Sequence, residues 1–321
     1  MAESSTKEYR FNAAALENSL DKLKDKGITE VAVDDEKITQ NREAFLRFLG
    51  KIRKFCPDIH FNFHIKIDCI DTVLVKALSQ SFCSLTIDVL SNTARDNNIR
   101  RNFTKKVSML NASGIVFGFL LFQSNSSFKE FRNLIDFLFT LYPNHMEFAF
   151  EKILPTATLS SVDIKNISRI SFSIETFYTK GRAVPWFLTA LEPLRIKASS
   201  FFMDFAEWLE CNNCTKSAAF DLDKTSHEEI EKMQIVFLKL KYEEKMLQPL
   251  FTALLDIVML QGAFSRATCE NTESILELSY SPDDLLSSTA QNLEYFTDNV
   301  CMQSSKIRVY PGIDELEIEV F

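Results

Sequence analysis

In the first half of the chain, short apolar runs alternate with stretches whose apolar residues recur every three to four positions. The apolar runs predict strands and the amphipathic stretches predict helices. Successive strands begin about 30 residues apart, which is the length of one βα unit. Strands are predicted over 29–34, 59–67, 84–90, 115–122 and 145–151, and helices over 12–26, 42–55, 71–81, 96–112 and 127–141.

Successive βα units imply a parallel sheet with right-handed crossovers, and either a barrel or an open doubly wound sheet would fit. The alternation within the strands favours a barrel. In "HFNFHIKID" (60–68) the aromatic and aliphatic residues point one way and the polar ones the other. Doubly wound sheets bury both faces, so their strands are continuously apolar. Strand 115–122 is apolar on both faces and departs from the pattern.

After about residue 160 the rhythm changes. Residues 185–262 have the pattern of helices throughout, followed by strands at 273–279, 306–310 and 315–321 and a helix over 283–299. The sequence therefore predicts an α/β protein. A partial, TIM-like βα barrel of about five parallel strands occupies residues 1–165, and a mainly helical C-terminal domain with a few strands occupies residues 166–321.

Composition narrows the function classes. A net charge of −8 argues against a nucleic-acid binder. The chain has only 7 Gly and no G-x-G-x-x-G motif, which argues against a phosphate-cradling loop. The densest basic run, Arg100, Arg101, Lys105 and Lys106, is expected on a solvated helix face. The start, "MAESSTKEYR", is too polar for a secretory signal, and no long uninterrupted apolar run predicts a membrane span. We therefore expect a cytoplasmic protein with reduced cysteines and no membrane partner.

Polar side chains gather at the predicted strand ends and inside the predicted barrel. Asp34, Asp35 and Glu36 follow the first strand, at the edge where βα barrels place their chemistry. Strand ends are also where a chain meets water, so both explanations remain open. The barrel interior is expected to hold Lys66 with four further residues: His64, Asp88, Glu147 and Glu151. These form either a functional site or a structural network that neutralises buried acids. His64 with Asp88 and Glu147 could make a metal site.

The order of these motifs resembles the radical S-adenosylmethionine superfamily, and within it the cobalamin-associated members with a helical C-terminal extension. The matching segments are "GITEVAVDDEKIT" (27–39), "PDIHFNFHIKIDCID" (57–71), "CSLTIDVLSNT" (83–93), "GIVFGFLLF" (114–122), "SFKEFRNLIDFLFTLYPNHMEFAFEKILPTATL" (127–159) and, weakly, "FYTKGRAVPWFLTAL" (177–191). By this resemblance Asp34, Asp35, Glu36, Lys66 and Ser91 would contact S-adenosylmethionine.

The departures from that family concern its chemistry. Its activity depends on C-x-x-x-C-x-x-C, whose thiolates hold a [4Fe–4S] cluster, and no such motif occurs in this sequence. Cys211 and Cys214 form a C-x-x-C, but about 180 residues too late in the chain, so we expect them to be reduced cysteines at a helix end. Catalytic residues are not identified, and no metal site is expected.

Three functions follow. The first is a degenerate, cluster-free radical S-adenosylmethionine-like protein, a pseudoenzyme that binds or scaffolds, without its own cofactor. A protein partner, such as an active paralogue, would dock at the exposed edge strand that carries Asp34. The alternative is a fragment of an active enzyme whose cluster-binding part, with S-adenosylmethionine and [4Fe–4S], lies on a separate or upstream segment. The third is a cluster-free hydrolase or metal enzyme that uses the polar barrel interior.

Overall fold

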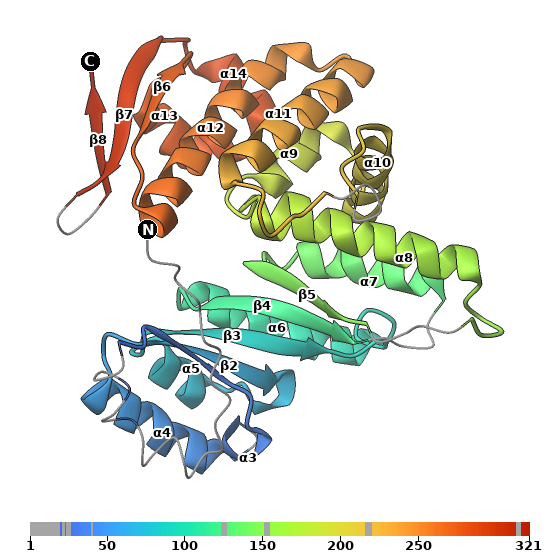
Figure 1. Ribbon diagram of the computed structural model, residues 1–321, viewed down its shortest axis with the longest axis vertical. Helices are drawn as coiled ribbons and strands as arrows, with labels where there is room; N and C mark the ends of the chain where they lie inside the picture. Colours follow the sequence, from blue (N-terminus) through green and yellow to red (C-terminus); the bar gives the residue numbers. More distant parts are fainter. Residues whose placement is uncertain are drawn as a thin grey trace. The chain divides into compact units, whose positions relative to one another are not determined.

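The computed structural model describes residues 27–39, 41–122, 127–150, 155–215, 220–312 and 316–321, together with Leu20 and Leu23 (Figure 1). The chain forms two compact units, residues 1–164 and 165–321. Most of the predicted helix 12–26 lies outside the described residues.

The first unit contains a parallel sheet whose strand order equals the chain order. Its strands are β1 (Glu30–Val33), β2 (His60–Lys66), β3 (Cys83–Val89), β4 (Val116–Phe122) and β5 (His145–Ala149). All four neighbouring pairs are parallel, so the predicted parallel sheet is confirmed. The segments between them form α3 (Glu36–Thr39), α4 (Arg42–Phe55), a short 3₁₀ turn (Ile67–Cys69), α5 (Thr72–Leu78), α6 (Asn97–Ala112) and α7 (Phe128–Phe139).

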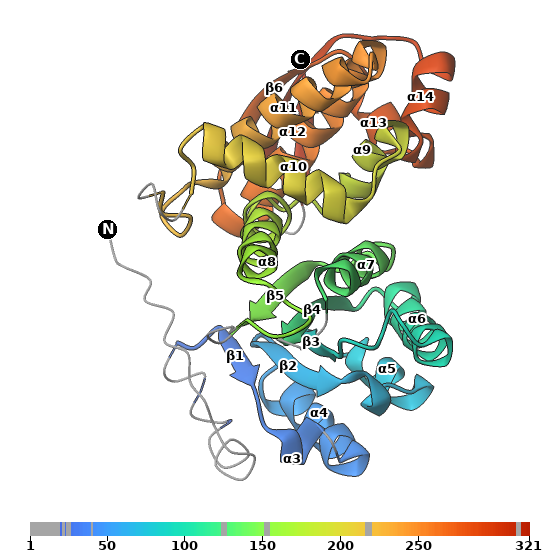
Figure 2. The same cartoon turned by 90° about the vertical axis from the view of Figure 1, so that its right-hand side faces the viewer.

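The helices of this unit cover one face of the sheet. Because the strand order never reverses, right-handed crossovers bring every connecting helix to the same side. Figure 2 shows α4, α5, α6 and α7 along that side of the curved sheet. The aromatic core lies between these helices and the sheet. Phe45 of α4 packs edge-on against Phe63 of β2, with 4.8 Å between ring centroids, and the ring of Phe103 of α6 lies 5.5 Å from that of Phe119 of β4. The result is the predicted partial barrel, with its polar strand positions on the opposite face.

Local signals begin and end these helices as the sequence suggests. Ser127 and Glu130 form a capping box at the start of α7, and Gly114 takes a left-handed φ of 65° between α6 and β4. One basic residue departs from expectation. The Lys106 ammonium group on α6 donates to the carbonyls of Ile67 (3.1 Å) and Asp68 (2.9 Å), so it ties down the segment after β2 rather than lying on the solvated face.

The second unit is mainly helical and ends in a small sheet. Its elements are α8 (Ser161–Ile174), which begins just before the boundary, a π-helical turn (Glu175–Lys180), α9 (Phe187–Leu194), α10 (Ala198–Cys211), α11 (His227–Glu244), α12 (Gln248–Glu270), β6 (Ser274–Leu278), α13 (Pro282–Leu286), a 3₁₀ turn (Ser288–Gln291), α14 (Leu293–Asn299), β7 (Ser305–Pro311) and β8 (Leu316–Val320). Strands β6, β7 and β8 are antiparallel in that order.

The single helix predicted over 283–299 is wrong. Ser287 takes an extended backbone (φ −71°, ψ 159°) after α13, and the side chain of Asn292 accepts from the amide of Tyr295 to begin α14. Both are residues that favour helix ends over helix interiors, because their side chains compete for backbone hydrogen bonds. The segment is therefore two short helices joined by a 3₁₀ turn.

Aromatic residues fill the core of the second unit. Phe177 lies within 5.0 Å of Phe201 and 4.9 Å of Phe205, measured between ring centroids. Phe201, Phe202 and Phe205 of α10 are therefore core residues. Among the described helices, α12 alone is long and apolar enough to cross a membrane. Of its apolar stretch, 61% is buried within the molecule, and core helices can be equally long and apolar.

Candidate functional site

Strand register aligns five positions across the polar face of the partial barrel. His64 of β2 pairs with Thr86 of β3, Thr86 with Gly118 of β4, and Gly118 with His145 of β5. Asp34, the residue that follows β1, comes beside His64 in the same row. Alternate residues of a strand point to opposite faces, so this row faces away from the covering helices. The candidate site is this row, together with the next polar positions along β3 and β5.

His64 is held between two carboxylates. Its Nδ1 lies 2.9 Å from Oδ1 of Asp34, and its Nε2 hydrogen-bonds to Oδ1 of Asp88. An ionised carboxylate only accepts hydrogen bonds, so both ring nitrogens must carry a proton and the imidazole is a cation. The hydrogen bond to Asp88 is the main cause that raises the pKa of His64 to about 9, helped by Asp34 and opposed by partial burial. This triad is therefore an ion network that persists at neutral pH.

His145 occupies the space that Gly118 leaves open. A Cβ atom at Gly118 would lie 2.2 Å from the His145 ring, so any larger residue would displace that ring. From this position Nε2 of His145 lies 3.2 Å from Oε1 of Glu147 and 3.4 Å from Oγ1 of Thr86. The Thr86 hydroxyl in turn donates to Oδ1 of Asn62 at 3.3 Å. The hydrogen bond from His145 is the main cause that lowers the pKa of Glu147.

The acidic groups of the face differ in their access to solvent. The side chains of Asp34 and Glu147 are 56% and 49% exposed, whereas those of His64 and Asp88 are 27% and 16% exposed. Asp34, Asp88 and Glu147 share this face with His64, Lys66 and His145, so carboxylate oxygens are its most numerous hydrogen-bond acceptors. The one hydroxyl in the row, on Thr86, is buried and already donates its proton. Chemically, the face is suited to accept hydrogen bonds from a ligand rather than to attack one.

The other residues predicted to contact S-adenosylmethionine take different places. The backbone carbonyl of Asp35 accepts from amides of α3, Lys66 is exposed at the last position of β2, and Ser91 is half-buried in the turn after β3. The side chain of Glu36 and the whole of Glu151 lie outside the described residues. Strand register therefore places Asp34 beside His64 and pairs Lys66 with Asp88 across β2 and β3.

Metal-binding geometry is not found in the described part of the chain. There, no group of three or more His, Cys, Asp or Glu side chains converges as metal ligands would. The combination of His64, Asp88 and Glu147 weighed from the sequence fails for a specific reason, since both nitrogens of His64 are engaged by carboxylates and Glu147 pairs with His145.

The thiols of the first unit lie at opposite ends of the sheet. Cys56 follows α4, where its thiol donates to the carbonyl of Leu20 at 3.3 Å, and Cys83 begins β3. Cys69 instead follows the carboxyl end of β2, and a seven-residue strand spans roughly 20 Å. Burial raises the pKa of Cys83 to about 12 and also raises that of Cys69. Metal and cluster ligation requires thiolates, so neither the spacing nor the protonation of these thiols suits a cluster.

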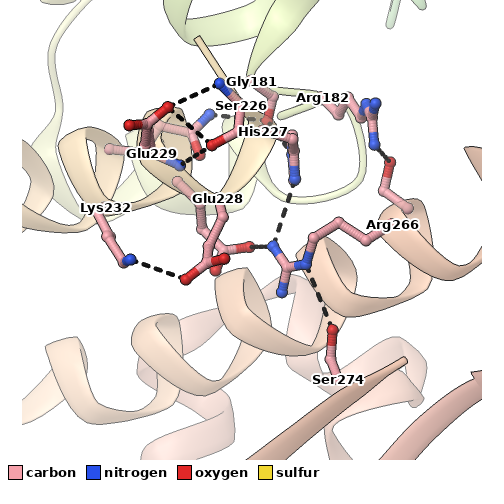
Figure 3. Close-up of polar contacts among 12 residues, drawn as sticks. Gly181, Arg182, Ser226, His227, Glu228, Glu229, Lys232, Arg266 and Ser274 are labelled. Carbon is pink, nitrogen blue, oxygen red and sulfur yellow. Dashed lines mark hydrogen bonds and ion pairs between the residues drawn. The ribbon is translucent and has the colours of Figure 1, made fainter. Parts of the chain in front are cut away.

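A second polar cluster is buried in the second unit, where α11 and α12 pack together (Figure 3). Nη1 of Arg266 donates to Glu231 at 2.7 Å and to Nδ1 of His227 at 3.4 Å. His227 therefore carries its proton on Nε2, which donates to the carbonyl of Gly181 at 3.4 Å. Burial is the main cause that lowers the pKa of His227 to about 4. Every polar group named here has a partner within the unit, so the cluster holds helices together.

Sequence reasoning missed His145, Thr86 and Gly118. The signal for His145 is present, because it stands two positions before Glu147 and must share its face of the strand. Thr86 is likewise in phase with Asp88. Gly118 has no such signal, since its role depends on the register of β4 against β5.

Comparisons with known proteins show a weak likeness in structure. No protein-family model and no curated protein matches the chain. Among solved structures it is similar to TsrM, a radical S-adenosylmethionine methyltransferase from Kitasatospora setae, whose structure has cobalamin and a [4Fe–4S] cluster bound. The sequence identity is 14% and the TM-score 0.35, and the match covers 43% of this chain and 30% of that chain. The chain thus spans less than a third of that enzyme, and a likeness of this size identifies neither ligand nor activity.

Proposed function

We propose that this chain is a radical S-adenosylmethionine-like partial barrel without its own iron–sulfur cluster, and that it works as a non-catalytic binding or scaffold protein. The observation that carries the proposal is the His64 cation between Asp34 and Asp88. In βα barrels, ligands are held at the carboxyl edge of the strands. Here a cation of the protein itself hydrogen-bonds to both acidic groups near that edge, so each already has a cationic partner within the chain.

The thiols support the same conclusion. A [4Fe–4S] cluster needs several thiolates at one place, with a spacing that matches the cluster. Cys56 and Cys83 lie at the amino ends of the strands and Cys69 at a carboxyl end. Their positions and the raised pKa values of Cys69 and Cys83 favour neutral, structural thiols.

A second candidate is a fragment that is completed by another polypeptide, and the position of β1 favours it. Among the described strands, β1 pairs with β2 alone and forms one edge of the parallel sheet. A strand supplied by an upstream segment or an active paralogue could pair with this edge, beside Asp34. The unpaired backbone groups of an edge strand readily pair with a further chain.

Anaerobic reconstitution of the purified chain with iron and sulfide tests the proposal. After desalting, we expect no absorbance near 400 nm and less than one tightly bound iron per chain. A variant in which Cys56, Cys69 and Cys83 are replaced by Ser should give the same absorbance and the same bound iron. A stoichiometric [4Fe–4S] cluster in the unmodified chain would overturn the proposal, and its loss from the variant would assign the ligands to the first unit.

The DNA upstream of the codon for Met1 separates the two candidates. An in-frame or frameshifted C-x-x-x-C-x-x-C there, whose co-expressed product restores a cluster to the chain, would establish the fragment. Its absence there would exclude an upstream segment as the source of the missing part.

A further inference from the structure

The small sheet of the second unit ends in a strand with an open edge. Within the described residues, β8 (Leu316–Val320) pairs with β7 alone. The amide of Phe321 donates to the carbonyl of Lys306 at 2.9 Å. In an antiparallel ladder the backbone groups of successive residues point to opposite sides. Odd-numbered positions of β8 therefore bond to β7, and the N–H and C=O groups of Ile318 and Val320 point to the open edge.

The apolar face of β8 extends the core but remains uncovered in the described structure. Leu316, Ile318 and Val320 share a face with Ile307 and Val309 of β7, because they pair across the ladder in register. Both β7 residues are 0% exposed, whereas the three β8 residues are 39%, 37% and 61% exposed. Removing such apolar surface from water is favourable, so a strand added here would extend an existing core.

The opposite face of β8 is acidic. Glu317 accepts from the hydroxyl of Tyr310 at 2.7 Å, and Glu319 lies 3.8 Å from Nη1 of Arg308, whose closer partner is Glu273. A second copy of the chain that paired antiparallel about Ile318 would set Glu317 of one copy opposite Glu319 of the other, twice. Like charges directly opposite each other destabilise a ladder. The edge is thus built against pairing with itself and matches a strand that carries the opposite charge.

We propose that β8 accepts an extended segment of another protein in which apolar residues alternate with Lys or Arg. The segment would add a fourth strand to the sheet by bonding to the open groups of Ile318 and Val320, the mode known as β-strand addition. Its apolar side chains would cover Leu316, Ile318 and Val320, and its basic side chains would face Glu317 and Glu319. The inference rests on the second unit alone and is independent of the cluster proposal.

Two synthetic heptapeptides provide the probes, Lys-Val-Lys-Ile-Lys-Val-Lys and Glu-Val-Glu-Ile-Glu-Val-Glu, each labelled with fluorescein. Fluorescence anisotropy with the full chain should show saturable binding of the Lys peptide and at least tenfold weaker binding of the Glu peptide. Replacing both Glu317 and Glu319 with Lys should reverse this preference. In a matched control, Glu243 and Glu244 at the exposed end of α11 are replaced by Lys. This control changes the net charge equally and should still prefer the Lys peptide.

A backbone variant tests the open edge itself. Ile318→Pro removes an N–H that points outward and leaves the hydrogen bonds to β7 in place. It should weaken binding of the Lys peptide at least tenfold, while the circular dichroism spectrum of the chain stays unchanged. Equal binding of both peptides, no binding of either, or an equal effect of the control at Glu243 and Glu244 would overturn the proposal. A dimer of the chain that Ile318→Pro dissociates would overturn the proposal as well, because a second copy would then occupy the edge of β8.

Discussion

Replacing Gly262 with Ala should destabilise the second unit although it lies inside a helix, where Ala is normally preferred. Gly262 faces α11, and a Cβ atom there would lie 1.6 Å from Oε2 of Glu231. A Cβ atom does not approach another non-bonded heavy atom within 3.0 Å, so the carboxylate must move. Moving it separates Glu231 from Nη1 of Arg266, now 2.7 Å away, in a place where both side chains are about 90% buried.

The expected cost combines two terms. Separating a buried ion pair costs about 3–5 kcal/mol, because a charge is left without its partner in a poorly solvated site. The change from Gly to Ala within a helix returns about 1 kcal/mol. The free energy of unfolding of the second unit should therefore fall by about 2–4 kcal/mol. With a urea m-value of about 1–3 kcal/mol/M, the midpoint should fall by roughly 0.7–4 M.

Urea unfolding of the whole chain, followed by circular dichroism, measures the effect. Gly50→Ala is the matched control: Gly50 lies within α4, and a Cβ atom there meets nothing within 4 Å, so the first unit should gain about 0.5–1 kcal/mol. A double-mutant cycle gives a sharper test. On a Glu231→Ala background the obstacle is gone, so Gly262→Ala should no longer destabilise.

Two results would refute the reasoning about Gly262. One is a loss below about 1 kcal/mol for Gly262→Ala in the otherwise unchanged chain, which would show that Glu231 has room elsewhere. The other is an equal loss on the Glu231→Ala background, which would assign the effect to backbone strain in α12 rather than to the ion pair.

Three further predictions concern single residues. The folded pKa of His227, about 4, lies below its ordinary 6.5, so His227 lowers the stability of the second unit as pH falls from 6.5 to 4. Burial raises the pKa of Asp256 to about 6, so Asp256 opposes this effect between about pH 4 and 6. The urea midpoint of the second unit should therefore fall more steeply on acidification in Asp256→Asn, and should rise on acidification in His227→Gln. Gly118→Ala should displace the ring of His145 and raise the pKa of Glu147 toward its ordinary value, measured by carboxyl ¹³C shifts. An unchanged slope in either variant, or an unchanged pKa for Glu147, would contradict the assigned contacts.

The sheet was predictable because its signals are local. Apolar runs about 30 residues apart, each followed by an amphipathic helix, require parallel strands, and the polar residues between Phe61, Phe63 and Ile65 predict one polar face. The helix predicted over 283–299 failed through a signal of the same kind, since Ser287 and Asn292 mark helix ends.

The site was predictable only in part because it depends on register between strands distant in sequence. His64 could be placed on the polar face, but its contact with Asp34 needs β1 and β2 aligned residue by residue. The position of His145 needs the missing side chain of Gly118 on the neighbouring strand. Periodicity states which face a residue occupies, and it does not state which residue lies beside it.

The account depends most directly on the charge of His64, and an NMR titration of its imidazole measures that charge. The chain has four His residues, so a His64→Gln variant assigns the signal. His64 should remain protonated at pH 7.5 and titrate near pH 9, and Asp88→Asn should lower its pKa. Because the folded pKa lies above the unfolded value, the network's stabilisation is complete below about pH 6.5 and is lost as pH rises through 9. A His64 that titrates at or below 6.5 in the unmodified chain would contradict the account, since Asp34 and Asp88 would then lack the protein's own cation.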